Sequence, residues 1–90
     1  MYAGITLLFA GEKTGTEVYA KVRPVGRDEV MEAAQHGLKS KYCMEVWENE
    51  YKNENEVEYN GKRLTVYRTY GPKPNGKIEV YVAERSGAGW

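Results

Sequence analysis

The sequence predicts a mainly β protein: a small antiparallel β-barrel or sandwich of about six strands, with one short α-helix between the second and third strands. Three observations lead to this prediction. Apolar and polar residues alternate with a period of two along most of the chain, one segment changes to a helical period, and an Asn-Gly pair joins two alternating segments. With 90 residues the chain is long enough for one domain, which we expect to span residues 1–90.

The first two strands are expected to form a hairpin. Ile5 to Phe9 is a short apolar run, and the segment from Glu17 to Val25 alternates, with Val18 on one face and Tyr19 on the other. Residues 11–15 begin and end with glycine, so they supply the turn between the two strands.

The helix is expected between Gly26 and Gly37, on an excursion that covers about residues 26–41. Val30 and Ala33 lie three residues apart, as one face of a helix requires, and Gly37 favours the left-handed conformation that ends a helix. This segment allows about two and a half turns. Because its apolar stripe includes alanines, we expect the helix to pack closely on a sheet edge rather than to form the core.

The third strand is expected from Tyr42 to Tyr51, with Trp47 on its outer, charged face. An exposed tryptophan is a common anchor of a protein interface, and partial burial of the indole in the monomer is an equally good interpretation. The two alternatives differ in whether the ring is open to a partner.

The Asn60-Gly61 pair predicts a two-residue type I′ hairpin, because both turn positions need a positive φ. This turn sets the register of the flanking strands. It pairs Val57 with Leu64 on the apolar face and Glu58 with Arg63, as an ion pair, on the other.

The last two strands are expected over Lys62–Tyr70 and Lys77–Glu84. Strict alternation places Arg68 on the same side as Leu64, so this guanidinium is expected to point toward the core. The tail 86–90, which ends in Trp90, is expected to be flexible.

Composition excludes several classes of protein. Thirteen basic residues balance thirteen acidic ones, so the chain lacks the excess positive charge that drives autonomous binding to nucleic acid. A single cysteine cannot form an intramolecular disulfide, which is typical of a cytosolic chain, and no apolar run is long enough for a membrane span or a signal peptide.

The residue types that carry catalysis are nearly absent, so the chain is not expected to be an enzyme. One histidine, His36, and one cysteine, Cys43, lie on different predicted elements, and no third group is marked to orient the imidazole. They cannot fill a zinc site with four ligands, and the glutamates between residues 45 and 58 lack the spacing of a calcium loop. No cofactor is expected.

The segment Lys62 to Arg68 interleaves basic and aromatic residues on a strand, as do sheets that stack single-stranded bases on residues such as Tyr67. A small nucleic-acid-binding β-barrel is therefore an alternative function. The other interpretation is an ordinary amphipathic strand.

Charge is segregated along the chain although it sums to zero. Residues 45–60 carry one basic and six acidic groups, a balance of −5, and residues 61–90 carry six basic and two acidic groups, a balance of +4. These blocks either cancel across the Asn60-Gly61 hairpin or meet between subunits in head-to-tail self-association. The candidate interface residues are Trp47, Glu48, Glu50, Tyr51, Glu58, Arg63 and Tyr67.

Four segments in one order carry a family resemblance: VYAKVRPVGRDE at residues 18–29, AAQHGLK at 33–39, VEYNGKRLTVYRTY at 57–70 and IEVY at 78–81. Over most of its length the chain resembles the head-tail joining proteins of tailed bacteriophages, also called head-closure, head-completion or head-tail adaptor proteins. It departs from their pattern at Gly26, where serine is frequent, and at Ser40, where proline often follows the Gly-Leu-Lys motif.

The resemblance implies a small antiparallel barrel whose subunits form a ring between the portal-bound adaptor and the tail. Such a ring closes the DNA-filled head and provides the attachment site for the tail, with packaged DNA near it in the channel and no membrane involved. The implied partners are further copies of the chain, the portal or adaptor and tail-completion proteins, in the virion and, before assembly, in the bacterial cytoplasm. The helix-bearing excursion is then the candidate contact to the adaptor or the channel lumen, through Arg27, Glu32, His36, Lys39 and Lys41.

Overall fold

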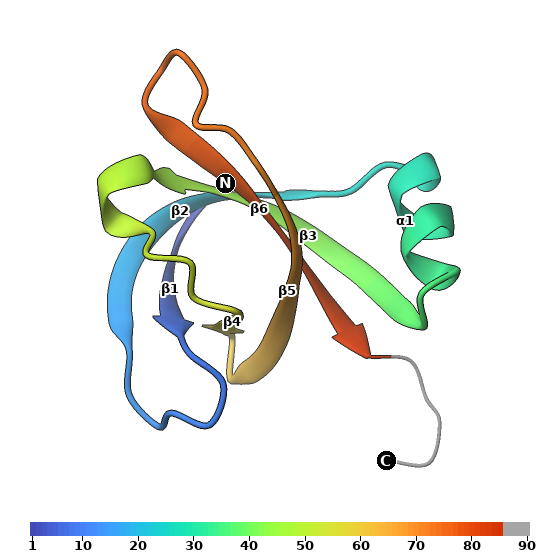
Figure 1. Cartoon of the computed structure of the whole chain (residues 1–90), viewed down its shortest axis with the longest axis horizontal. Helices are drawn as coiled ribbons and strands as arrows, with labels where there is room; N and C mark the ends of the chain where they lie inside the picture. The colour runs from blue at the N-terminus through green and yellow to red at the C-terminus, as the bar shows by residue number, and fades with distance from the viewer. Residues whose placement is uncertain (86–90) are drawn as a thin grey trace.

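The strands close into an antiparallel barrel, which confirms the mainly β fold and selects the barrel over the sandwich (Figure 1). The computed structural model describes residues 1–85, so the predicted tail 86–90 and Trp90 lie outside the described residues. The elements are β1 (Tyr2–Leu8), β2 (Thr16–Pro24), α1 (Arg27–Ala34), β3 (Leu38–Trp47), the 3₁₀ turn η1 (Glu48–Glu50), β4 (Glu56–Tyr59), β5 (Lys62–Tyr70) and β6 (Lys77–Arg85).

Neighbouring strands follow the order β1-β2-β3-β6-β5-β4, and β4 pairs back with β1 to close the barrel. The longest ladder joins β3 to β6, from Leu38 opposite Arg85 to Trp47 opposite Lys77. The closing pair is much shorter, because only Thr6–Leu8 of β1 meets β4. Helix α1 is inserted between β2 and β3, as the sequence predicted.

Side chains from alternate positions of every strand fill the interior of the barrel. In the part of the chain that the structure describes, the hydrophobic core consists of twelve almost completely buried residues: Ile5, Leu7, Val18, Ala20, Val22, Met44, Val46, Val57, Tyr59, Leu64, Val80 and Val82. The period-two pattern in the sequence is therefore the pattern of the barrel wall, with one set of residues inside and the other outside.

The hairpin at Asn60 and Gly61 has the predicted register, with φ values of 52° and 76° at the two turn residues. Val57 and Leu64 face each other inside the barrel, as expected. The predicted ion pair is wrong, however: Arg63 pairs with Glu56, two residues before Glu58 on the same face of β4. Its long side chain reaches diagonally across the hairpin instead of straight across it.

Strand boundaries differ from the prediction at both ends of β3, which begins at Leu38 instead of Tyr42 and ends at Trp47 instead of Tyr51. Gly37, with φ of 73°, turns the chain from the helix directly into the strand. After Trp47 the chain enters η1 and leaves the sheet. Strand β1 also begins earlier than predicted, at Tyr2, because its first residues pair with β2 through Tyr2 and Lys21.

Arg68 lies outside the barrel, so the prediction that it points toward the core is wrong. The register between β5 and β6 shifts between Val66 and Arg68, where Tyr67 is the additional residue of a β-bulge. One additional residue exchanges the two faces for the rest of the strand. Arg68 and Tyr70 are accordingly exposed.

Candidate interaction surfaces

Helix α1 presents apolar side chains to solvent. Its eight residues turn Ala33 and Glu29 toward the barrel, where Ala33 is 2% exposed. Met31 and Val30, on the other side, are 61% and 41% exposed. The helix is shorter than predicted, and Val30 belongs to its outer side rather than to a buried stripe. We call the outward residues Arg27, Val30, Met31 and Ala34 the helix face.

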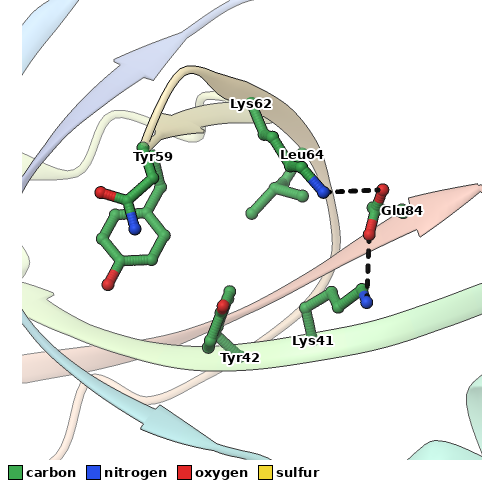
Figure 2. A pocket seen from close by; sticks show the side chains of 7 residues that line it. Lys41, Tyr42, Tyr59, Lys62, Leu64 and Glu84 are labelled. Atoms are coloured by element: carbon green, nitrogen blue, oxygen red, sulfur yellow. Dashed lines mark ion pairs between the residues drawn. The ribbon is translucent and has the colours of Figure 1, made fainter.

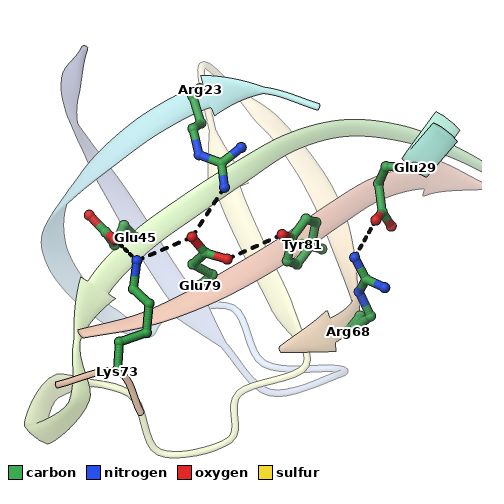
Figure 3. Close-up of polar contacts among 7 residues, drawn as sticks. All are labelled: Arg23, Glu29, Glu45, Arg68, Lys73, Glu79 and Tyr81. Atoms are coloured by element: carbon green, nitrogen blue, oxygen red, sulfur yellow. Dashed lines mark hydrogen bonds and ion pairs between the residues drawn. The ribbon is translucent and has the colours of Figure 1, made fainter. Parts of the chain in front are cut away.

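A carboxylate fixes α1 to β5. Glu29 accepts a hydrogen bond from the Tyr67 hydroxyl at 2.6 Å. It also accepts an ion-paired hydrogen bond from Arg68, which Figure 3 shows. The hydroxyl oxygens of Ser40 and Tyr67 lie 2.6 Å apart, which ties the start of β3 to the same group. We call Glu29, Ser40, Tyr67 and Arg68 the helix clamp. Burial and the hydrogen bond to the Glu29 carboxylate raise the pKa of Tyr67 to about 12.

A hollow of about 150 Å³ lies beside the helix clamp, between α1 and β5. It brings together three residues that the sequence placed in two separate groups: Glu32 and His36 from the predicted adaptor contact, and Tyr67 from the predicted interface. His36 lies in the turn that follows α1 and is exposed.

A chain of polar contacts crosses the outer wall over β2, β3 and β6 (Figure 3). Glu79 accepts hydrogen bonds from Arg23 at 3.1 Å and from Lys73 at 3.2 Å, and Lys73 also pairs with Glu45. Burial alone would raise the pKa of Glu79, but the bonds from Lys73 and Arg23 outweigh it and lower the pKa. Hydrogen bonds to Glu45 and Glu79 raise the pKa of Lys73.

Cys43 lies on the outer side of β3 and is 1% exposed. Burial raises the pKa of its thiol, although the positive charge of Arg23 acts in the opposite direction. The reactive form of cysteine is the thiolate, which this environment disfavours.

Lys77 and the rings of Tyr2 and Trp47 form a second exposed surface, and Tyr19, opposite Gly4 in the β1–β2 pair, lies diagonally from Tyr2 on the same face. We call Tyr2, Tyr19, Trp47 and Lys77 the aromatic patch. The tyrosines are 61% and 72% exposed, and Trp47 is 49% exposed, as predicted for an outward residue of β3. The Lys77 ammonium lies 4.7 Å from the centre of the Trp47 ring and 5.9 Å from that of Tyr2. These cation–π contacts hold Lys77 between the two rings.

The charged side chains of Lys41, Lys62 and Glu84 lie around a pocket that is also lined by Tyr42, Tyr59 and Leu64 (Figure 2). The Glu84 carboxylate forms salt bridges with the Lys41 ammonium, at 3.1 Å, and with the Lys62 ammonium, at 3.8 Å. The hydrogen bond from Lys41 is the main cause of the lowered pKa of Glu84. Lys41, a predicted adaptor contact, is therefore already paired within the subunit.

The remaining predicted interface residues fall into different environments. Glu48, in η1, and Glu58, on β4, are exposed, whereas Glu50 is half-buried. Tyr51 is half-buried, packs against the core and donates its hydroxyl to the Glu54 carbonyl at 2.7 Å, so its side chain is engaged within the subunit. Glu54, by contrast, is 3% exposed and accepts a hydrogen bond from the backbone N–H of Lys52.

The two charge blocks cancel in part within the subunit. Glu45 and Glu56, from the acidic block, pair with Lys73 and Arg63 of the basic block. Glu48, Glu50 and Glu58 have no ion-pair partner among the side chains that the structure describes. The acidic residues of this block that could pair with a neighbouring subunit are thus concentrated in η1 and on β4.

Sequence reasoning missed the helix clamp and most of the aromatic patch. Glu29 and Tyr67 are 38 residues apart, and no periodicity within one element connects them. Tyr2 was left out of the first predicted strand, and no register was predicted that would place it opposite Lys21, where the structure has it.

Two further findings concern the nature of the surfaces. In residues 1–85 no three His, Cys, Asp or Glu side chains gather closely enough to hold a metal ion. No helix in this part of the chain is both long and apolar enough to cross a membrane.

Compared with known proteins, the sequence matches no family model and no curated protein.

Proposed function

We propose that this chain is a structural subunit of the head-tail connector of a tailed bacteriophage or prophage, where copies form a ring between the portal or adaptor and the tail. In this role the ring closes the DNA-filled head and provides the attachment site for the tail. The subunit contributes surfaces rather than chemistry, so no cofactor or catalytic residue is part of the proposal.

The fold supports this proposal because it has the architecture that the sequence resemblance implies. The barrel is antiparallel, and α1 is inserted between β2 and β3. Apart from the pocket lined by Tyr42, Tyr59 and Leu64, the interior is filled by side chains such as Met44 and Val82, both 0% exposed. The groups that the proposal uses lie on the outer surface.

The observation that carries the proposal is the helix face. An eight-residue helix is too short to be stable alone in water, so its position depends on Ala33 and the helix clamp. A helix fixed in this way, with Met31 and Val30 turned to solvent, is typical of a contact with another protein rather than of a folding core. In a connector, the helix face would contact the adaptor or a neighbouring subunit.

The alternative, nucleic-acid binding through Lys62–Arg68, finds less support in the contacts of that strand. The hydroxyl of Tyr67 is bonded to Glu29 and Ser40, and its ring is half-buried. Arg68 pairs with Glu29 and lies over the Tyr81 ring, 4.4 Å from its centre. Neither side chain is open to stack on a base as sheets that bind single strands require.

Deletion of the gene from its phage or prophage tests the function. We expect lysates of the deletion strain to contain filled or partly emptied heads and separate tails, by negative-stain electron microscopy, and expression of the chain in trans to restore joined particles. Intact virions in the deletion lysate would refute the proposed function.

A further inference from the structure

The helix face and the aromatic patch lie at opposite ends of one strand. Strand β3 begins next to α1 and ends at Trp47, so its ten residues separate the two surfaces. In Figure 1, α1 stands at one end of the longest axis, while η1, which follows Trp47, stands at the other. A subunit with two exposed surfaces so placed can contact two neighbours at once.

The two surfaces are complementary in chemistry. The aromatic patch offers wide, flat rings with Lys77 and, next to Tyr2 across the β1–β2 pair, Lys21. The helix face offers the flexible Met31, whose thioether packs well against aromatic rings.

The charges around the two surfaces are also complementary. Asp28 lies in the first turn of α1 and Glu32 lines the hollow on its β5 side, whereas Lys77 belongs to the patch and Lys21 lies opposite Tyr2 beside it. None of these four residues has an ion-pair partner among the side chains described in residues 1–85. A charge of the opposite sign is present on each side as well, since Arg27 begins α1 and Glu48 follows Trp47.

We propose that α1 of one subunit docks on the aromatic patch of the next copy, so that the subunits associate head to tail. Such a contact is heterologous, because different surfaces of the two copies meet, and it generates a closed ring when the rotation between subunits closes. This inference rests on the proposed connector function and names the interface through which its ring forms.

A two-fold contact of either surface with itself is disfavoured by charge. Two aromatic patches face to face would gather four lysines, Lys21 and Lys77 of both copies, in one interface. Two helix faces would likewise gather Asp28 and Glu32 of both copies. Head-to-tail docking instead brings the carboxylates of Asp28 and Glu32 toward Lys21 and Lys77, and places Arg27 of the helix face toward the side of the patch that carries Glu48.

Two variants, each with one surface disrupted, test the proposal on the full chain. Met31→Lys places a charge in the centre of the helix face, and Tyr19→Lys adds a second lysine to the patch, which already holds Lys77 and has Lys21 beside it. Both side chains are more than half exposed, so neither change disturbs the core. Phe9→Lys, in the β1–β2 connection away from both surfaces, is the control for a general effect of lost exposed aromatic area.

Sedimentation velocity measures the outcome over a range of protein concentrations. We expect the wild type and Phe9→Lys to form oligomers, and each single variant to stay monomeric, with its dissociation constant raised about tenfold or more. An equal mixture of Met31→Lys and Tyr19→Lys keeps one intact interface, so it forms a dimer and nothing larger.

Several results would overturn the proposal: a wild type that stays monomeric at its highest soluble concentration, a variant that assembles like the wild type, or a mixture without dimers. Binding of a short single-stranded oligonucleotide that is lost in Tyr19→Ala and Trp47→Ala would assign the patch to nucleic acid instead. If these tests fail while the gene deletion still leaves heads and tails unjoined, the interface is wrong and the connector function stands. Intact virions from the deletion strain would overturn the function itself.

Discussion

The Tyr67 hydroxyl donates a hydrogen bond to Glu29 across 2.6 Å, and in doing so it joins the bulge of β5 to the first turn of α1. The bulge is what makes this contact possible. Without the additional residue in β5, Arg68 would point into the barrel and could not reach the other oxygen of the same carboxylate. One irregularity in the sheet therefore positions the helix.

Replacement of Glu29 by glutamine is expected to release α1 without unfolding the barrel. The change removes the charge that Arg68 pairs with and weakens the acceptor for Tyr67, and a helix of this length does not persist unsupported. Hydrogen exchange of the α1 amides should rise by about tenfold or more, while the amides of β3 and β6 keep their protection. Glu32→Gln, on the same helix but outside the clamp, should leave exchange unchanged, and equal exchange in both variants would contradict this role for Glu29.

The raised pKa of Tyr67 predicts a loss of stability at high pH. The unfolded chain releases the phenolic proton near its ordinary pKa of 10.0, whereas the folded chain holds it to about 12. The stabilisation is thus complete below the unfolded pKa and is lost as pH rises toward the folded one. Urea unfolding at a series of pH values should show a smaller decline for Tyr67→Phe than for the wild type. The raised pKa of Lys73 contributes equally to both proteins, so parallel declines would argue against this assignment.

Gly15 is expected to tolerate no side chain. A Cβ atom at this position would lie 2.0 Å from the Leu7 carbonyl oxygen, which is backbone in the β1–β2 pair and cannot move aside. We expect Gly15→Ala to lower the free energy of unfolding by about 1–3 kcal/mol, measured by chemical denaturation. At Gly26 a Cβ would meet no atom within 4 Å, so Gly26→Ala is the matched control, with an expected loss of only about 0.5 kcal/mol. Similar losses at both positions would show that the close approach in the structure is wrong.

Reversal of Glu48 and Glu50 to lysine should weaken assembly more than folding, because Glu48 follows Trp47 in the patch and is the carboxylate available there to Arg27 of the docked α1. Neither side chain has an ion-pair partner among the described residues, so their removal leaves the intramolecular pairs in place. The free energy of unfolding should stay within about 0.5 kcal/mol of the wild type, whereas sedimentation should show weaker association. Glu17→Lys, on β2, is the control and should leave association unchanged. Normal assembly of the double variant Glu48→Lys, Glu50→Lys would show that η1 is not part of the interface.

The parts of the fold that sequence could predict are those fixed by local patterns. The register at Asn60 and Gly61 follows from two adjacent residues that both accept a positive φ, and the barrel wall follows from a period of two. The bulge at Tyr67 leaves no trace in the alternation, because it is defined only against the partner strand. The same limit hid the pairing of Arg63 with Glu56, which depends on the reach of a long side chain rather than on register.

The candidate surfaces were predictable to a smaller extent. Trp47 could be placed on the outer wall because one strand sets its direction. Lys77 and Tyr2 come to it from strands far away in the chain, and the sequence contains nothing that joins the three. The direction of Met31 was hidden for another reason, since the side of α1 that faces the barrel is chosen by a clamp on β5.

The long β3–β6 ladder, which runs from Leu38 to Trp47, has a mechanical consequence. If neighbouring subunits hold the two ends of β3, tension around the ring runs along this strand and loads its hydrogen bonds in shear. Bonds sheared in this direction must break together, whereas bonds peeled from one end break in succession. Strand β3 would thus make each subunit stiff along the circumference of the ring, the direction in which internal pressure from a filled head would stretch it.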